Sequence, residues 1–248
     1  MPFEAPFPSV QDKVDHLNTT YQNHAVIPTL QWVLQDDRLG RIALVSSFGA
    51  ESVVLLHMVS LIKPDLPILF IDTEMLFAET LAYLQDLAEQ LGLEDVRVIH
   101  AEKEAIKKAD PFGRLHLAAP DQCCQLRKVV PLQKALLEFD GWITGRKRFQ
   151  ADSRASIDQF ENENDLRLKI NPLAHWRPQD LQDYILNNRL PRHPLVEKGY
   201  PSIGCAPEVC TRKVSSGENP RSGRWSGKSK AECGIHIGAN GKIERAAP

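Results

Sequence analysis

Residues 41–52 read Arg-Ile-Ala-Leu-Val-Ser-Ser-Phe-Gly-Ala-Glu-Ser, and this stretch decides the fold. Its first six residues are an apolar run of the kind that forms a short buried strand. A polar turn with a glycine follows, and apolar positions then recur at helical spacing as far as Leu61. The pattern predicts a strand, a tight turn and a helix in direct succession.

The same alternation continues along the chain. The alternation of predicted strands and helices ends at Gly199. Residues 215–231 are rich in Gly, Ser and Lys, which is typical of a mobile segment. We therefore divide the chain into a domain at 1–214 and a mobile C-terminal tail at 215–248. Alternating strands and helices predict an α/β fold, a doubly wound and mostly parallel sheet with helices on both faces. The predicted strands are 67–72, 96–100, 142–145 and 166–171, and the predicted helices are 76–92, about 122–139 and 178–187.

The composition is that of an ordinary soluble protein, with 42% hydrophobic and 25% charged residues. No segment approaches the ~20 consecutive apolar residues that cross a bilayer, and the start of the chain has no basic leader. We expect a cytoplasmic protein that does not contact membranes. Its 5 cysteines should then bind metal or do chemistry rather than form disulfides.

Charge is distributed unevenly along the chain. Residues 1–122 hold 9 Lys and Arg against 18 Asp and Glu, whereas residues 123–248 hold 21 against 14. A basic half suits an anionic ligand, and the total of −2 argues against non-specific nucleic-acid binding. The sequence predicts a small anionic substrate rather than nucleic acid.

Polar residues gather where the predicted strands end. Ligands of parallel sheets bind at the carboxyl ends of the strands, and a helix N-terminus there favours an anion. The segments at these ends are 46–52, Asp72 with Thr73, and the basic run 145–148. The first is not a Walker loop, because no Gly-Lys-Ser/Thr follows. An ordinary N-capped turn at 46–52 and a solvated basic face at 145–148 are the alternatives.

Four of the cysteines form two close pairs, Cys123-Cys124 and Cys205 with Cys210. Each pair is followed by an Arg-Lys dipeptide, whose charges would offset thiolates around an iron–sulfur cluster. Buried small hydrophobic residues and a structural zinc site are the alternatives.

The fifth cysteine, Cys233, stands in the sequence Glu-Cys-Gly-Ile-His near the end of the basic tail. Nearby cations lower the pKa of a thiol and make it reactive. An unused thiol on a disordered tail is the alternative.

Taken together, these segments resemble the adenylyl-sulfate reductases, relatives of the phosphoadenylyl-sulfate reductases on the adenine-nucleotide α-hydrolase scaffold. The resemblance covers residues from about 20 to 238. The matching segments are 46–52, 71–73 with 76–77 and 79–80, Cys123-Cys124 with Arg127-Lys128, 145–150, 200–205, Arg221, Arg224-Trp225 and 232–236. Two positions depart from the usual pattern. Glu74-Met75 follows Asp72-Thr73 where Gly-Lys or Gly-Tyr is usual, and four residues instead of two separate Cys205 from Cys210.

The resemblance implies one [4Fe–4S] cluster, held by Cys123, Cys124, Cys205 and Cys210. It also implies that Cys233 attacks the sulfur of adenylyl sulfate, that AMP leaves, and that thioredoxin or a similar dithiol protein releases sulfite from an enzyme S-sulfocysteine. The residues expected at the substrate are Ser46, Ser47, Gly49, Ser52, Asp72, Thr73, Lys128, Gly145, Arg146, Arg221, Arg224 and His236.

Three other activities stay open at this point. Reduction of the 3′-phosphorylated nucleotide is the nearest, although relatives with that substrate lack the cysteine pairs. An ATP-dependent thiolase or amidotransferase on the same scaffold would carry a Ser-Gly-Gly-x-Asp-Ser loop, whereas this chain has Phe48 in place of the first glycine and Glu51 in place of the aspartate. A cluster-carrying nucleotide sensor without catalysis is the third. The sequence leaves the oligomeric state open, a homo-oligomer included.

Overall fold

The computed structural model describes residues 6–22, 24–215, 217–225 and 234–235. A six-stranded sheet lies at the centre, in the order β3-β2-β1-β4-β6-β5. All neighbouring strands run parallel except β5, which is antiparallel to β6. The strands are β1 (Ile42–Val45), β2 (Ile68–Ile71), β3 (Val96–Ile99), β4 (Gly141–Thr144), β5 (Phe160–Glu163) and β6 (Arg167–Ile170).

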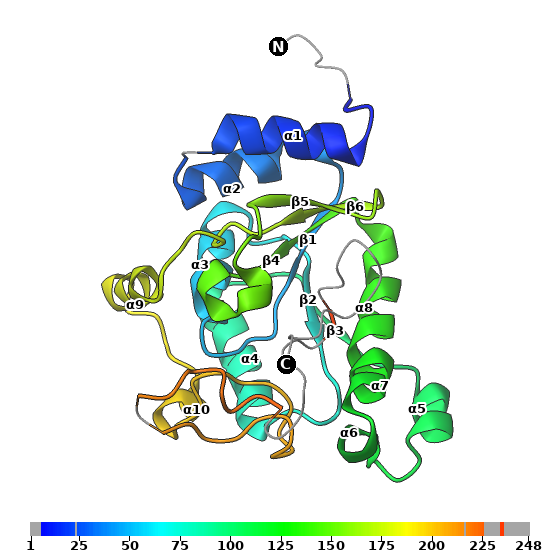
Figure 1. Cartoon of the computed structure of the whole chain (residues 1–248). Coiled ribbons are helices and arrows are strands. Elements are labelled where there is room, and N and C mark those ends of the chain that lie inside the picture. The colour runs from blue at the N-terminus through cyan, green and yellow to red at the C-terminus, as the bar shows by residue number, and fades with distance from the viewer. Residues whose placement is uncertain (1–5, 23, 216, 226–233, 236–248) are drawn as a thin grey trace.

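Helices cover the two faces of this sheet unequally (Figure 1). One face packs against α1, α2, α3, α4 and α9 in the large apolar cluster. The other face, which includes Ala43, Leu69 and Trp142, packs against α8 and the turn after it. The helices are α1 (Val10–Tyr21), α2 (Val26–Gln35), α3 (Ser52–Ile62), α4 (Ala78–Leu91), α5 (Lys103–Ala109), α6 (Leu115–Ala118), α7 (Pro120–Cys124), α8 (Val130–Ala135), α9 (Pro178–Asn187) and α10 (Pro194–Glu197).

The α/β fold predicted from the sequence is confirmed, with strands and helices alternating as expected around a mostly parallel sheet. Side chains of β1 alternate between the two apolar clusters, because successive residues of a strand point to opposite faces. Helix α4 ends at Gly92, whose φ of +62° suits the left-handed position that closes a helix. No helix in the described ranges has the length and apolarity needed to span a membrane.

The helix predicted at about 122–139 is interrupted in the structure. Residues Gln125–Val129 form a π-helical turn between α7 and α8. Pro131 explains the interruption, because it has no N–H to donate and its ring clashes with the carbonyl group of Arg127, four residues earlier. Turns of this kind are frequent at functional sites, and this one carries Lys128.

A buried histidine links α10 to α4 and so holds the chain that leads to Cys205. His193 has no exposed surface, and its Nδ1 accepts the N–H of Leu195 at 3.2 Å. Nε2 must then carry the proton that it donates to Thr80 Oγ1, at 3.1 Å. The ring also lies 4.8 Å from that of Tyr83, centroid to centroid. Burial lowers the pKa of His193 to about 4.

This depressed pKa predicts an acid-sensitive fold. Between pH 6.5 and about 4 the unfolded chain binds a proton at His193 that the folded chain excludes, so the free energy of unfolding falls as the pH is lowered through this window. In His193→Gln that slope should become shallower, by up to about 1.4 kcal/mol per pH unit. Urea unfolding at several pH values measures it, and identical slopes in both proteins would contradict the assignment.

Candidate active site

A cavity of about 530 Å³ lies at the carboxyl ends of β1 and β4. These two strands are parallel neighbours, so their ends reach the same edge of the sheet. The volume is within the range of roughly 300 to 1,000 Å³ that small-molecule sites occupy. The cavity brings together most of the residues expected at the substrate: Ser46, Ser47, Gly49, Ser52, Lys128, Gly145, Arg146, Arg221 and Arg224.

The loop between β1 and α3 forms one wall of this cavity. Ser46 Oγ accepts the N–H of Phe48 at 3.2 Å, and Ser52 Oγ accepts that of Gly49 at 3.0 Å. Phe48 adopts a left-handed backbone, with φ at +46°, and its buried ring packs edge-on against Phe70. This packing fixes the loop at the start of α3. Backbone N–H groups and the helix dipole there favour an anionic ligand.

The segment after β4 forms the opposite wall and holds Arg146 in one orientation. Arg146 donates from Nε and Nη2 to Asn171 Oδ1, at 3.2 and 3.1 Å, and forms an ion pair with Glu161. Asn171 also accepts a hydrogen bond from Thr144 Oγ1 at 3.0 Å. The guanidinium group is therefore positioned before any ligand arrives, which favours binding because less freedom is lost.

The sequence analysis did not single out Lys147 and Glu51, which line the same cavity. Lys147 Nζ lies 2.5 Å from Glu51 Oε2, and Gln150 donates to the same oxygen at 2.8 Å. The side chain of Lys147 is only 3% exposed, whereas that of Glu51 is 35% exposed. Burial lowers the pKa of Lys147, and the charge of Glu51 partly offsets this. Glu51 therefore favours the charged form of a buried lysine at the cavity.

Removal of Glu51 should destabilise the fold, because Lys147 would be left buried without its counter-charge. We expect Glu51→Ala to lose about 2 kcal/mol, less than a fully buried pair because Glu51 is partly exposed. The double variant Glu51→Ala with Lys147→Met should recover most of the loss. Urea unfolding of both variants measures this. A double variant no more stable than the single one would contradict it.

The four paired cysteines line a second, smaller cavity beside the first. Cys123 and Cys124 end α7, whereas Cys205 and Cys210 come from the segment after α10, and all four are buried. Cys205 is held against the segment that follows β2, because Leu76 in that segment forms an antiparallel bridge with it. The topology thus unites two pairs that are about 80 residues apart in the sequence.

Cations and hydrogen bonds surround these thiols. Burial raises the pKa of Cys123 to about 11. A hydrogen bond from the Cys210 thiol lowers the pKa of Cys205, with help from Lys128 and Thr73, against the opposing effect of burial. Thr73 Oγ1 lies 3.3 Å from the Cys205 sulfur atom. The cavity is therefore partly prepared for negative sulfur ligands.

Buried Arg127 lies at the base of the same cavity. It forms an ion pair with Asp110 at 3.0 Å and donates to the carbonyl oxygen of Thr73 at 3.0 Å. Arg127 thereby ties α7 and its cysteine pair to the end of β2.

The donor set fits an iron–sulfur cluster. Within the described part of the chain, no three His, Cys, Asp or Glu side chains are grouped as ligands of a single metal ion. A [4Fe–4S] cluster makes a different demand, because each of its four irons takes its own cysteine and the ligands surround the cluster. Four thiols line this one small cavity together with Arg127 and Lys128, and they are the donors and counter-charges that such a cluster requires.

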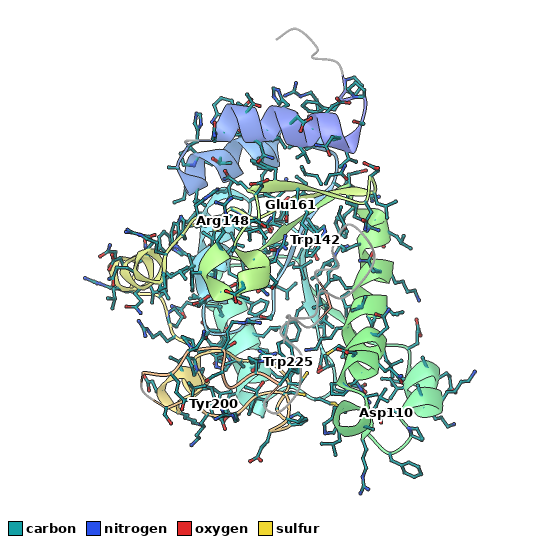
Figure 2. All side chains as sticks on the ribbon, in the orientation of Figure 1. Asp110, Trp142, Arg148, Glu161, Tyr200 and Trp225 are labelled. Atoms are coloured by element: carbon teal, nitrogen blue, oxygen red, sulfur yellow. The ribbon has the colours of Figure 1, made fainter. Side chains whose placement is uncertain are left out.

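Lys128, Arg224 and Trp225 line both cavities and so separate them. Arg224 Nε donates to the carbonyl oxygen of Cys210 at 3.1 Å, and its guanidinium carbon lies 4.6 Å from the centre of the Trp225 ring. The backbone N–H of Trp225 donates to the same carbonyl oxygen of Cys210 at 3.3 Å. Figure 2 shows Trp225 near the middle of the molecule, between the segment of Tyr200 and the region of Asp110.

Four of the residues predicted for the substrate and for catalysis are not among the described residues that line the first cavity. Thr73 lines the cysteine cavity instead. Asp72 lines neither cavity, and its carboxylate accepts the N–H of Glu74 at 2.8 Å. Cys233 and His236 lie outside the described residues. Ile235, which the sequence analysis did not select, does line the first cavity.

Comparison with known proteins finds the same scaffold. Residues 41–213 match the model of the phosphoadenosine phosphosulfate reductase domain. An adenosine 5′-phosphosulfate reductase of Mesorhizobium japonicum is 50% identical over 79% of this chain and 76% of its own length. One from Halalkalibacterium halodurans is 38% identical over 92% of this chain and 98% of its own length. The crystal structure of phosphoadenylyl-sulfate reductase from Candida auris, in a phosphate complex, superposes with a TM-score of 0.66 at 28% identity, covering 81% of this chain and 98% of that one.

The family match spans most of the chain and includes both cysteine pairs and both strand-end loops, and the Halalkalibacterium halodurans relative aligns over nearly its full length. This chain belongs to the phosphoadenosine phosphosulfate reductase family.

Proposed function

We propose that this protein reduces adenylyl sulfate to sulfite and AMP in sulfate assimilation, with electrons from a dithiol protein. The observation that carries the proposal is the cavity at β1 and β4, which gathers Lys128, Arg146 and Arg224 opposite the loop at the start of α3. The names of the relatives from Mesorhizobium japonicum and Halalkalibacterium halodurans support this substrate.

The charge of the substrate explains why the cavity needs these cations. Adenylyl sulfate joins a phosphate and a sulfate in one anhydride, so an attacking thiolate approaches an anion and expels another anion. Fixed positive charges lower the energy of that transition state, especially where water is excluded. We assign the loop of Ser46, Ser47, Gly49 and Ser52 to the anionic end of the nucleotide. Lys128, Arg146, Arg221 and Arg224, with His236, would neutralise the phosphosulfate group.

The reaction would proceed in three displacements. The Cys233 thiolate attacks the sulfur of the sulfate group, the S–O bond breaks, and AMP leaves with the electron pair. A thiolate of the dithiol protein then attacks the Cys233 sulfur atom and expels sulfite, which carries away the electron pair of the S–S bond. The second thiol of that protein displaces Cys233 from the mixed disulfide. The dithiol protein, for which we propose thioredoxin, thereby supplies both electrons.

Replacement of Cys233 tests the first displacement directly. Cys233→Ser should form no covalent adduct with adenylyl sulfate, because a serine hydroxyl is not ionised near neutral pH. Its affinity for AMP should stay within about twofold of the wild-type value, since the cavity lining is otherwise intact. Intact-protein mass spectrometry detects the adduct, and calorimetry measures the affinity. An adduct in Cys233→Ser would exclude this nucleophile.

We further propose one [4Fe–4S] cluster, held by Cys123, Cys124, Cys205 and Cys210. When bound, it would supply a fixed local charge and a structural tie between α7 and the 205–210 segment. Electron delivery is not needed from it, because the dithiol supplies both electrons. Lys128 would act between the two centres, since it lines both cavities.

Iron and sulfide content tests the cluster independently of turnover. Anaerobically purified protein should contain about four iron and four sulfide per chain, and Cys210→Ser should lose most of both. Ser215→Ala is a suitable control, because it changes one small side chain five residues from Cys210 that lines neither cavity. Iron-free wild-type protein that still released sulfite would remove the cluster from the proposal and leave the reductase activity.

Substrate choice and location complete the proposal. We favour adenylyl sulfate over the 3′-phosphorylated nucleotide because of the two cysteine pairs. A cluster-carrying sensor without catalysis would bind nucleotide but release no sulfite.

Free thiols and a dithiol donor point to a reducing compartment, so we place the reaction in the cytoplasm. We also keep the division into a domain at 1–214 and a catalytic tail at 215–248 as part of the proposal.

A further inference from the structure

Ile235 belongs to the C-terminal tail but packs against the sheet. It joins the apolar cluster on the sheet face that α8 covers. The neighbours in that cluster are Ala43, Leu69, Ile71 and Trp142 from the strands, Leu132, Leu136 and Phe139 from α8 and the turn after it, and the partly buried Val45, Ala135 and Ile99.

The sheet face explains why an apolar tail residue is held there. Five helices cover the opposite face, whereas α8 with its following turn provides the helical contribution to this cluster. Val45 and Ile71 are the last residues of their strands, and both line the first cavity together with Ile235. Ile235 adds apolar surface at this end of the cluster, and removing such surface from water is favourable.

The residue before Ile235 is adapted to this position. Gly234 is buried, and its φ is +76°, a left-handed conformation that residues with a β-carbon adopt at a cost. Glycine therefore lets the chain turn immediately before the isoleucine side chain enters the cluster.

The same isoleucine lines the first cavity together with the loop of Ser46 and with Lys128. Cys233 is separated from it by Gly234 alone. Since consecutive Cα atoms lie about 3.8 Å apart, a fixed Ile235 limits how far the Cys233 backbone can move from the cavity.

We propose that Ile235 is a positioning residue, an apolar anchor that holds the nucleophile of the tail at the substrate cavity. This inference rests on the proposed function, because it assumes that Cys233 attacks the substrate. The role requires apolar volume rather than a specific shape, so leucine should replace isoleucine and alanine should not.

Single-turnover kinetics with adenylyl sulfate test the anchor. In Ile235→Ala, formation of the Cys233 adduct should slow about tenfold, the effect expected when roughly 1.4 kcal/mol of apolar contact is lost. Affinity for AMP should change less than about twofold, because the loop and the cations stay in place. Ile235→Leu should stay within about twofold of the wild-type rate. Leu186→Ala is the matched control, since that leucine is 65% exposed on α9.

A second readout does not depend on the reaction. Trypsin should cut after Lys228 and Lys230 several-fold faster in Ile235→Ala than in the wild type or Ile235→Leu, because the anchor restrains the neighbouring chain. If the wild type forms the adduct and Ile235→Ala forms it at the same rate, the anchor is overturned and the proposed reaction is not. A loss of AMP affinity as large as the loss of rate would overturn it too, since Ile235 would then shape the cavity. Wild-type protein that forms no adduct would overturn the proposed reaction itself.

Discussion

The adjacency of β1 and β4 at the centre of the sheet is the constraint on which the rest of the structure depends. From β1 the chain proceeds through β2 to β3 at one edge, and from β4 it proceeds towards β6 and β5 at the other. The loops that follow these two strands therefore diverge and leave a hollow between them, as parallel sheets do where the strand order reverses. Both walls of the larger cavity come from these loops. A different strand order would separate the serine loop from Arg146.

Charge is organised around that hollow by pairing. Arg146 with Glu161, and Lys147 with Glu51, show that the cations near the strand ends are held by carboxylates before a ligand binds. Such pairs contribute little to stability because desolvation offsets their attraction. Their value lies in orientation, since a fixed guanidinium or ammonium group need not reorganise when negative charge develops on a substrate.

The position of the cysteine cavity depends on the same strand order. The crossover from β3 to β4 passes through α7 and α8, which delivers the first cysteine pair and Lys128 next to the end of β2. The segment of Cys205 then bridges to Leu76 just after β2. Arg224 and Trp225 attach the start of the tail to Cys210 by hydrogen bonds to one carbonyl oxygen. The segment that carries Cys205 and Cys210 therefore connects the proposed cluster site, the substrate cavity and the start of the tail.

The buried strands and the helices between them could be predicted from the sequence because their patterns are local. Strand β5 could not, since it depends on a hairpin in which Asn164 and Asp165 both adopt positive φ, a turn signal weaker than Asn-Gly. The position of the cavity could be predicted from the strand-end loops. The ion pair of Lys147 could not, because its partner lies 96 residues away and no local sequence pattern connects the two. Ile235 is an ordinary apolar residue in a polar tail, and only the contact with the sheet distinguishes it.

Reduction of adenylyl sulfate in this cavity is the central proposal. The most direct measurement is sulfite release by the anaerobically purified full chain with thioredoxin, with adenylyl sulfate and 3′-phosphoadenylyl sulfate compared side by side. We expect sulfite from adenylyl sulfate, with a higher kcat/KM than that for the 3′-phosphorylated nucleotide. Nucleotide binding without sulfite release, or a higher kcat/KM for the 3′-phosphorylated nucleotide, would contradict it.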